Sequence, residues 1–319
     1  RLSAFRARAM HELDPARQEG DTNRAITLKL AGDFQRAASL ERNLLELRER
    51  HLEAGDANID ALRTNLGATL IRLGKLDEAQ VLLEKAISGF EVSLGRDHEF
   101  MQNALAALAV VMKNKGELQA ARDLEARVLE ARLRTFPDDH QAVTFARENL
   151  ANTMARLGDI PGSRELREKV LAVRASTLAE NHPQLLQARG NLGATLLLEH
   201  RYAEGRELLK EAIEGLGRIL SPEHPFLLDQ RANLAIACAR LADYPAAREA
   251  LEQIIELREQ VFGPDDYGTL VAREQLGHVL HQLGELEPAR RQLEEVLAAL
   301  ADGDPGDVPE RLVVREHLL

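Results

Sequence analysis

The stretch Asn65-Leu-Gly-Ala-Thr-Leu-Ile-Arg-Leu-Gly74-Lys-Leu-Asp-Glu-Ala79 decides the fold of this chain of 319 residues. It returns with substitutions at multiples of 42 residues, beginning at Asn149, Asn191, Asn233 and Gln275. A fixed period of this length is typical of a solenoid, in which each repeat buries its apolar face against its neighbours. The sequence therefore predicts about seven repeats in place of one or two ordinary globular domains.

Two apolar stripes with helical spacing predict two helices in each repeat. In residues 58–73 the stripe contains Leu62, Leu66 and Leu70, and a second stripe runs over residues 76–94. A glycine that ends the first helix separates the two, and a small residue five positions later lets the two backbones approach closely. The glycine position is occupied by Gly32, Gly74, Gly116, Gly158, His200, Ala242 and Gly284, and the small position by Ala37, Ala79, Ala121, Ser163, Gly205, Ala247 and Ala289.

Histidines recur in the polar connectors between repeats, at His98, His140, His182 and His224. Acidic and amide residues precede them and prolines follow two of them, a pattern typical of the start of a helix. Packed helices lie about 8–10 Å apart, too far for such histidines to share one ion at roughly 2 Å per bond. We interpret them as helix-start residues and expect neither a metal nor a cofactor.

Composition excludes several classes of protein. The chain has 41 basic and 52 acidic residues, a net charge of −11, which argues against a nucleic-acid partner. Aromatic residues make up 3%, so a core of Leu and Ala is expected, which favours helices. The sequence has no apolar run of about 18 residues and no apolar leader after Arg1. We expect no membrane segment and a cytoplasmic location.

Catalytic motifs are absent from the sequence. It contains no Gly-x-x-x-x-Gly-Lys-Ser/Thr loop, no His-Glu-x-x-His and no Gly-x-Ser-x-Gly. The single cysteine, Cys238, occupies the position of Leu70 and is therefore expected in the core. These observations predict a chain that is not an enzyme.

The repeat resembles the tetratricopeptide repeat (TPR), and its 42-residue period and His-containing connector resemble the kinesin-light-chain variety. The matching residues are Leu66, Gly67, Leu70, Gly74, Leu76, Ala79, Leu83 and Ala86. The resemblance implies an all-α, right-handed superhelical solenoid of antiparallel helix pairs, with about seven full repeats and partial ends, over residues 1–319. The expected boundaries are 1–12 for a helix of a preceding repeat, 14–57, 58–99, 100–141, 142–183, 184–225, 226–267 and 268–308 for the full repeats, and 309–319 for the start of an eighth.

A polar stripe follows the first helix of each repeat, at the positions of Ala61, Thr64, Asn65, Ala68, Ile71 and Arg72. In TPR proteins the equivalent stripe lines the concave groove, so the resemblance implies a peptide-binding groove here. Its predicted binding residues are Asn65, Asn149, Asn191, Asn233, Arg72, Arg156 and Arg240. An amide can pair with a peptide backbone and an arginine with a carboxylate. The alternative is that the asparagines bond neighbouring helices within the solenoid.

Charges along the polar stripe nearly cancel. Its charged members are Lys29, Arg72, Lys113, Arg156 and Arg240 against Glu19, Glu148, Asp229 and Glu274. A ligand of mixed or slightly acidic character is therefore expected. The apolar members Val110, Phe145, Leu197, Leu198 and Ile236 either anchor a ligand or pack against neighbouring helices.

A ladder of arginines lies two residues before the asparagine position. Its members are Arg63, Arg147, Arg189, Arg231, Arg273 and Arg315, and Leu105 interrupts it. Either the ladder recognises a ligand or each arginine pairs with an acidic residue of an adjacent helix. We favour internal pairing.

Two functions are consistent with this sequence. The first is a non-catalytic module that binds a protein or peptide in its groove. The second is the sensor or regulatory region of a larger bacterial signalling effector, with an NTPase, kinase or caspase-like protease domain in the same parent chain. Residues 312–318 align with the start of an eighth repeat, which we expect to continue into such a parent.

Overall fold

The computed structural model describes residues 15–51 and 56–302, and in these residues it contains helices and no strand. The helices are α2 (Pro15–Leu30), α3 (Phe34–His51), α4 (Ala57–Arg72), α5 (Leu76–Ser93), α6 (Glu99–Asn114), α7 (Leu118–Thr135), α8 (Gln141–Arg156), α9 (Ile160–Thr177), α10 (Pro183–Leu198), α11 (Tyr202–Leu216), α12 (Pro225–Arg240), α13 (Tyr244–Phe262), α14 (Tyr267–Gln282) and α15 (Leu286–Asp302). The two expected partial repeats and Arg315 lie outside the described residues. The predicted all-α repeat architecture is confirmed.

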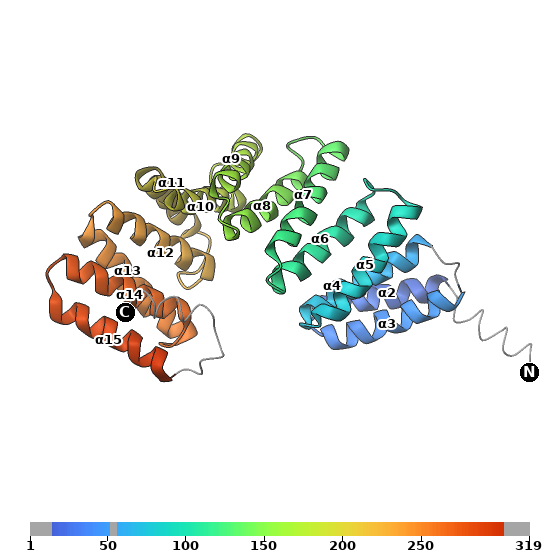
Figure 1. Ribbon diagram of the computed structural model, residues 1–319, viewed down its shortest axis with the longest axis horizontal. Helices are drawn as coiled ribbons and strands as arrows, with labels where there is room; N and C mark the ends of the chain where they lie inside the picture. Colours follow the sequence, from blue (N-terminus) through green and yellow to red (C-terminus); the bar gives the residue numbers. More distant parts are fainter. Residues whose placement is uncertain (1–14, 52–55, 303–319) are drawn as a thin grey trace, which may run out of the picture. The chain divides into compact units, whose positions relative to one another are not determined.

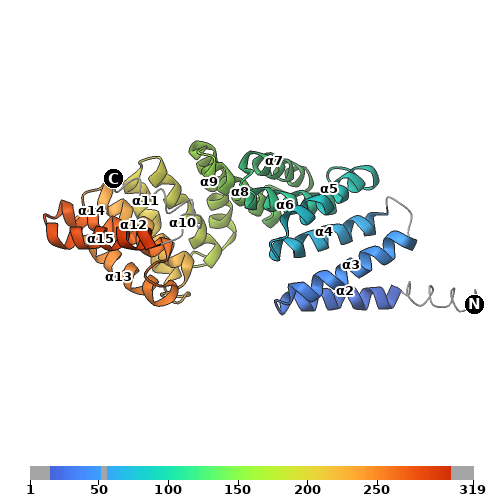
Figure 2. The same cartoon turned by 60° about the horizontal axis from the view of Figure 1, so that its bottom comes forward.

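The chain forms two compact units, residues 1–159 and 160–319. The first unit carries α2 to α8 and the second α9 to α15, and within each unit consecutive helices lie side by side in chain order (Figures 1 and 2). First helices of successive repeats also touch: α4 contacts α6, and α12 contacts α14. Each unit is therefore a stack of local contacts, and the prediction of one continuous solenoid stays a prediction.

Leucine and alanine build the core between the two helices of a repeat. Leu66 and Leu70 of α4 and Leu83 of α5 are at most 1% exposed, so both predicted stripes face inward. Gly67 brings the backbones close, because a Cβ atom there would lie 2.9 Å from the Leu83 side chain. Each fully buried leucine contributes about 1.5–3 kcal/mol to folding.

A residue in the left-handed conformation ends the first helix of each repeat. After α4, the amide of Gly74 donates to the Ile71 carbonyl at 3.1 Å and that of Lys75 to the Leu70 carbonyl at 3.0 Å. The φ angles at this position are 79° for Gly32, 71° for Gly74, 81° for Gly116, 84° for Gly158, 60° for His200, 61° for Ala242 and 79° for Gly284. His200 and Ala242 therefore keep the turn despite lacking glycine, and their Cβ atoms make that conformation costly.

The connector histidines cap the helices that follow them. The Nδ1 atom of each accepts a hydrogen bond from the backbone amide two residues later, which satisfies one of the free donors at the helix start. The distances are 3.2 Å for His98, 3.2 Å for His140, 3.2 Å for His182 and 3.3 Å for His224. The predicted helix-start role is confirmed.

Replacing Ala242 with glycine should stabilise the second unit. The left-handed conformation costs a residue with a Cβ roughly 1–2 kcal/mol, and glycine regains part of this despite its greater freedom when unfolded. We expect Ala242→Gly to raise the midpoint of thermal unfolding measured by circular dichroism. The reverse change Gly284→Ala is the matched control and should lower it; an unchanged or lower midpoint for Ala242→Gly contradicts the strain.

Candidate functional site

The predicted binding asparagines lie on the first helices with their amides unused by the fold. Asn65 and Asn149 are exposed, and Asn191 and Asn233 are half-buried. Among the described residues, the side-chain amides of these four asparagines make no hydrogen bond. The backbone carbonyl of Asn65 accepts one from Thr69 Oγ1 at 3.1 Å. The bonds expected from internal asparagines are thus not found there, and ligand binding by these residues stays a prediction.

The three predicted arginines lie at the ends of first helices and are exposed. Arg72 and Arg156 belong to the first unit, where the Arg72 guanidinium lies over the Phe34 ring at 5.1 Å from its centroid. Arg240 belongs to the second unit and makes no ion pair within the described part of the chain. Its charge is therefore available to a ligand.

An open pocket of about 560 Å³ lies beside Arg240, between α12 and α14. Its lining residues are Ala235, Ile236, Ala239, Arg240, Tyr244, Leu251, Gln275, His278, Val279 and Gln282. Six of them occupy positions of the polar stripe: Ile236 and His278 are equivalent to Ala68, Gln275 to Asn65, Ala239 to Ile71, and Arg240 and Gln282 to Arg72. The predicted stripe and the pocket therefore coincide in this unit.

The pocket combines an apolar floor with polar groups that the fold leaves available. Leu251 and Val279 form the floor and are 1% and 3% exposed. Gln275 Oε1 is buried without a hydrogen-bond partner in the described residues, so this amide does not use its full bonding capacity. With the Arg240 guanidinium alongside, the pocket has the chemistry to hold an apolar side chain next to a carboxylate.

Two lysines assigned to the polar stripe by sequence serve the core instead. Lys29 Nζ donates to Glu41 Oε1 at 2.8 Å, and Lys113 Nζ to Glu125 Oε1 at 2.6 Å. The two glutamates are 2% and 4% exposed. Because a buried carboxylate needs a partner, these lysines are held in place, and the expected charge balance of the stripe was wrong at both positions.

A pattern in the sequence could have revealed these pairs. The residue types at three positions change together from repeat to repeat. The sets are Lys29 with Glu41 and Thr69, Ile71 with Leu83 and Val111, Lys113 with Glu125 and Thr153, Ala155 with Arg167 and Thr195, Leu197 with Leu209 and Ala237, and Ala239 with Leu251 and Val279. In the first set Thr69 Oγ1 also donates to Glu41 Oε2, at 2.6 Å. Polar neighbours accompany each glutamate, and apolar neighbours accompany each leucine.

The apolar members of the polar stripe divide between surface and core. Val110, Phe145 and Leu198 are 37%, 41% and 57% exposed and can contact a ligand. Leu197, at 7%, packs in the core with Leu209, which is the second of the two alternatives that the sequence left open. Cys238 is 6% exposed, and burial raises the pKa of its thiol, as expected for a core cysteine.

The arginine ladder pairs internally, as we favoured from sequence. Each described member reaches an acidic side chain or a carbonyl of its own or a neighbouring element. Arg63 bonds Asp60 and Glu49, both at 2.7 Å; Arg147 bonds Asp138; Arg189 lies 3.2 Å from Glu211; Arg231 bonds the Pro222 carbonyl at 3.3 Å; and Arg273 bonds Glu259 and Glu295. Arg63, Arg189 and Arg273 thus pair with acidic residues of an adjacent helix, whereas Arg147 and Arg231 bond the connector before their own helix.

The tetratricopeptide repeat family model matches residues 58–134, 143–218, 187–260 and 227–302. The chain belongs to this family. A search of curated proteins gave no match. Within the described ranges, no helix has the length and apolar character needed to cross a membrane.

Solved structures of similar proteins agree with this fold. A kinesin light chain of Podosopora anserina with nearly identical TPR-like repeats is 25% identical; the match covers 63% of this chain and 95% of that one, with a TM-score of 0.54. BtubC (BKLC) of P. vanneervenii is 17% identical over 74% and 93% of the chains, with a TM-score of 0.55. The STAND protein PH0952 of Pyrococcus horikoshii, which has a tetratricopeptide repeat sensor, is 12% identical over 88% and 41%, with a TM-score of 0.69.

The ladder yields a prediction about pH at Asp60, whose carboxyl is 1% exposed and bonded to Arg63. Burial raises the pKa of Asp60 and outweighs the opposing effects of Arg63. A carboxyl with a raised folded-state pKa contributes stability below its ordinary pKa, and this is lost as the pH rises through the raised value. The wild type should therefore lose stability relative to Asp60→Asn as the pH rises from about 4 towards neutrality, because only the wild type has to ionise this carboxyl. The melting temperature of the variant minus that of the wild type should increase over this range.

Thermal unfolding monitored by circular dichroism across that pH range checks this prediction. The exposed Asp77→Asn is the control for loss of one carboxylate and should show a smaller change with pH. A difference between Asp60→Asn and the wild type that is constant with pH would show that this carboxyl does not titrate abnormally.

Proposed function

We propose that this chain is a non-catalytic protein-interaction module that binds a peptide or protein segment along its polar stripe. Tetratricopeptide repeats in general are protein-interaction modules, and the family assignment supports that class of function. The observation that carries the proposal is the pocket between α12 and α14, where Arg240 has no ion-pair partner in the described residues.

An extended segment suits the chemistry of this surface. Asn191, Asn233 and Gln275 follow one another at equivalent positions of α10, α12 and α14, so a peptide backbone crossing these helices would meet an amide at each. Arg240 would pair with an acidic side chain, and an apolar neighbour would occupy the floor of the pocket. The ligand class is therefore a peptide that carries an apolar residue beside an acidic one.

The proposal is tested with a peptide selected on the full chain from a random library. Truncating Arg240 removes a charge-assisted hydrogen bond worth about 1.5–3 kcal/mol, so Arg240→Ala should weaken binding by about 10- to 150-fold. Isothermal titration calorimetry measures the change. Arg218→Ala removes the same charge from a side chain that is 73% exposed and remote in sequence from the pocket residues, and should leave affinity unchanged. Equal affinity of Arg240→Ala and the wild type would reject this pocket as the site.

The amide positions give an independent prediction. Asn191→Ala with Asn233→Ala removes two groups that make no hydrogen bond within the described residues. The melting temperature should hardly change, while affinity for the selected peptide should fall by about 5- to 150-fold for two lost bonds. A clear loss of stability with intact affinity would instead assign these asparagines to the solenoid itself.

A second candidate function is the sensor region of a larger signalling effector. The observation that favours it is the likeness to PH0952, whose repeats are described as a sensor within a STAND protein. In that case a segment bound at the polar stripe would alter the activity of an NTPase domain in the same parent chain. The reading frame of the parent protein, and its ATPase rate with and without the selected peptide, decide between the two functions.

A further inference from the structure

The arginine ladder is interrupted at one repeat of the first unit, and a pocket lies at the interruption. At two other positions of the described ladder the arginine of a first helix reaches a neighbouring second helix, as Arg63 reaches Glu49 and Arg273 reaches Glu259. In α6 the same position holds Leu105, which is 3% exposed and cannot form such a pair. A pocket of about 570 Å³ lies above it, between the end of α5 and α7.

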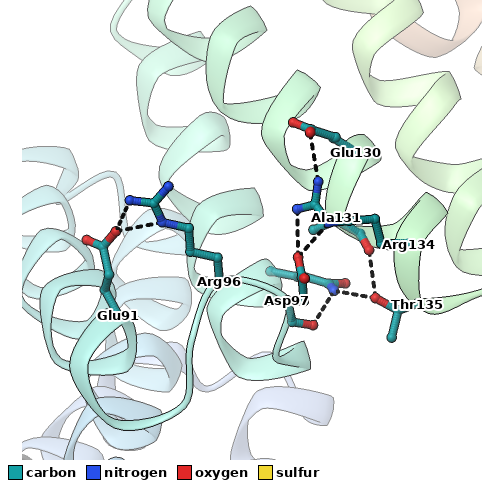
Figure 3. Close-up of polar contacts among 8 residues, drawn as sticks. Glu91, Arg96, Asp97, Glu130, Ala131, Arg134 and Thr135 are labelled. Carbon is teal, nitrogen blue, oxygen red and sulfur yellow. Dashed lines mark hydrogen bonds and ion pairs between the residues drawn. The ribbon is translucent and has the colours of Figure 1, made fainter.

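The pocket has an apolar floor and charged walls. Leu105 and Ala131 form the floor, and the remaining lining residues are Glu91, Arg96, Arg127, Glu130 and Arg134. Figure 3 shows Arg96 reaching back to Glu91 and Arg134 placed between Asp97 and Glu130. Three guanidinium groups and two carboxylates thus surround a space large enough for a ligand group.

The charge inside the pocket differs from that in the neighbouring ladder. Glu91 occupies the position of Glu49 and Glu259, which accept from ladder arginines, but here it pairs with Arg96 at 3.0 Å. Arg127 occupies a position that holds Glu211 and Glu295 in two later repeats and lysine in the two adjacent ones, Lys85 and Lys169. Among the described residues Arg127 makes no ion pair or hydrogen bond.

The other two arginines are held by contacts that a ligand can exchange. Arg134 donates to Asp97 Oδ1 from Nε at 3.0 Å and from Nη2 at 2.6 Å, and to Glu130 at 2.7 Å. Its side chain is 47% exposed and that of Arg96 is 76% exposed. Ion pairs exposed in this way contribute little to stability, so re-pairing them with an incoming anion costs little.

We propose that this pocket is a second binding site, which takes an acidic side chain of a partner polypeptide with Arg127 as its direct ion-pair partner. The guanidinium forks match the geometry of a carboxylate, and the stem of a glutamate would pack on Leu105 and Ala131. The site lies between second helices, whereas the polar stripe lies on first helices, so its occupant is distinct from the segment bound along the stripe.

The experiment uses the full chain and a synthetic peptide of alternating leucine and glutamate, at low ionic strength. Hydrogen exchange of the α5 and α7 amides, followed as a function of peptide concentration, reports binding at this site separately from binding at the polar stripe. We expect the peptide to slow exchange in both helices. Arg127→Gln should raise the concentration required by about 10-fold or more. Arg122→Gln removes the same charge from α7 outside the pocket and should have no effect.

Leu105→Arg provides the strongest variant because it restores the ladder. The new guanidinium would fill the pocket and meet Glu91, as Arg63 meets Glu49, and protection by the peptide should disappear. If that variant fails to fold, the comparison of Arg127→Gln with Arg122→Gln still decides the outcome. Unchanged protection in Arg127→Gln would overturn the proposal. Protection by inorganic pyrophosphate without protection by the peptide would overturn its assignment to a polypeptide partner.

The alternative is that the pocket binds a cationic ligand, because Glu91 already accepts from the guanidinium of Arg96 and could accept from that of a ligand. An arginine-rich peptide of the same length tests it under the same conditions. Protection by this peptide that strengthens in Arg127→Gln would overturn the proposal. Loss of the Arg240-dependent binding at the polar stripe has no bearing on this result, because the exchange readout is confined to α5 and α7.

Discussion

The structure depends on one backbone constraint, the left-handed residue that ends each first helix. Without it, the chain could not reverse within two or three residues and lay the second helix along the first. The constraint is local, so glycine meets it most easily, yet His200 and Ala242 adopt the same conformation at φ values of 60° and 61°. Packing of the flanking helices therefore outweighs the cost of a Cβ in the left-handed region.

The turn places a second helix against the first, but each pair still has to recognise its neighbour. Polar residues in the core contribute to this recognition. Glu41 is buried with Lys29 and Thr69, whereas the equivalent set of the next repeat, Ile71, Leu83 and Val111, is apolar. Stacking these repeats out of order would bury a carboxylate without a partner, which is far more costly than the loss of one leucine contact. The polar sets thus favour pairing with a repeat that supplies the matching polar residues.

The two binding sites that we propose lie on surfaces that the stacking of helices creates. First helices present a polar stripe whose amides are not used by the fold, and Arg240 stands beside a pocket on that stripe. Between second helices, the ladder arginine Arg273 pairs with Glu259, and both residues line a pocket of the second unit. Where Leu105 stands in place of the arginine, the pocket is lined by Arg127, which has no ion-pair partner in the described residues.

The sequence by itself determined the repeat, the two helices of each pair, the residues that end and cap them, and the apolar core, because all of these arise from contacts between residues near one another in the chain. It also located Arg240 and the interruption at Leu105. Tertiary structure alone decided which stripe residues reach the surface. Lys29 and Leu197 occupy stripe positions, but Glu41 draws the first into the core and Leu209 covers the second. Their partners lie one helix away, so helical periodicity within a single segment cannot show whether a side chain points at solvent or at a neighbour.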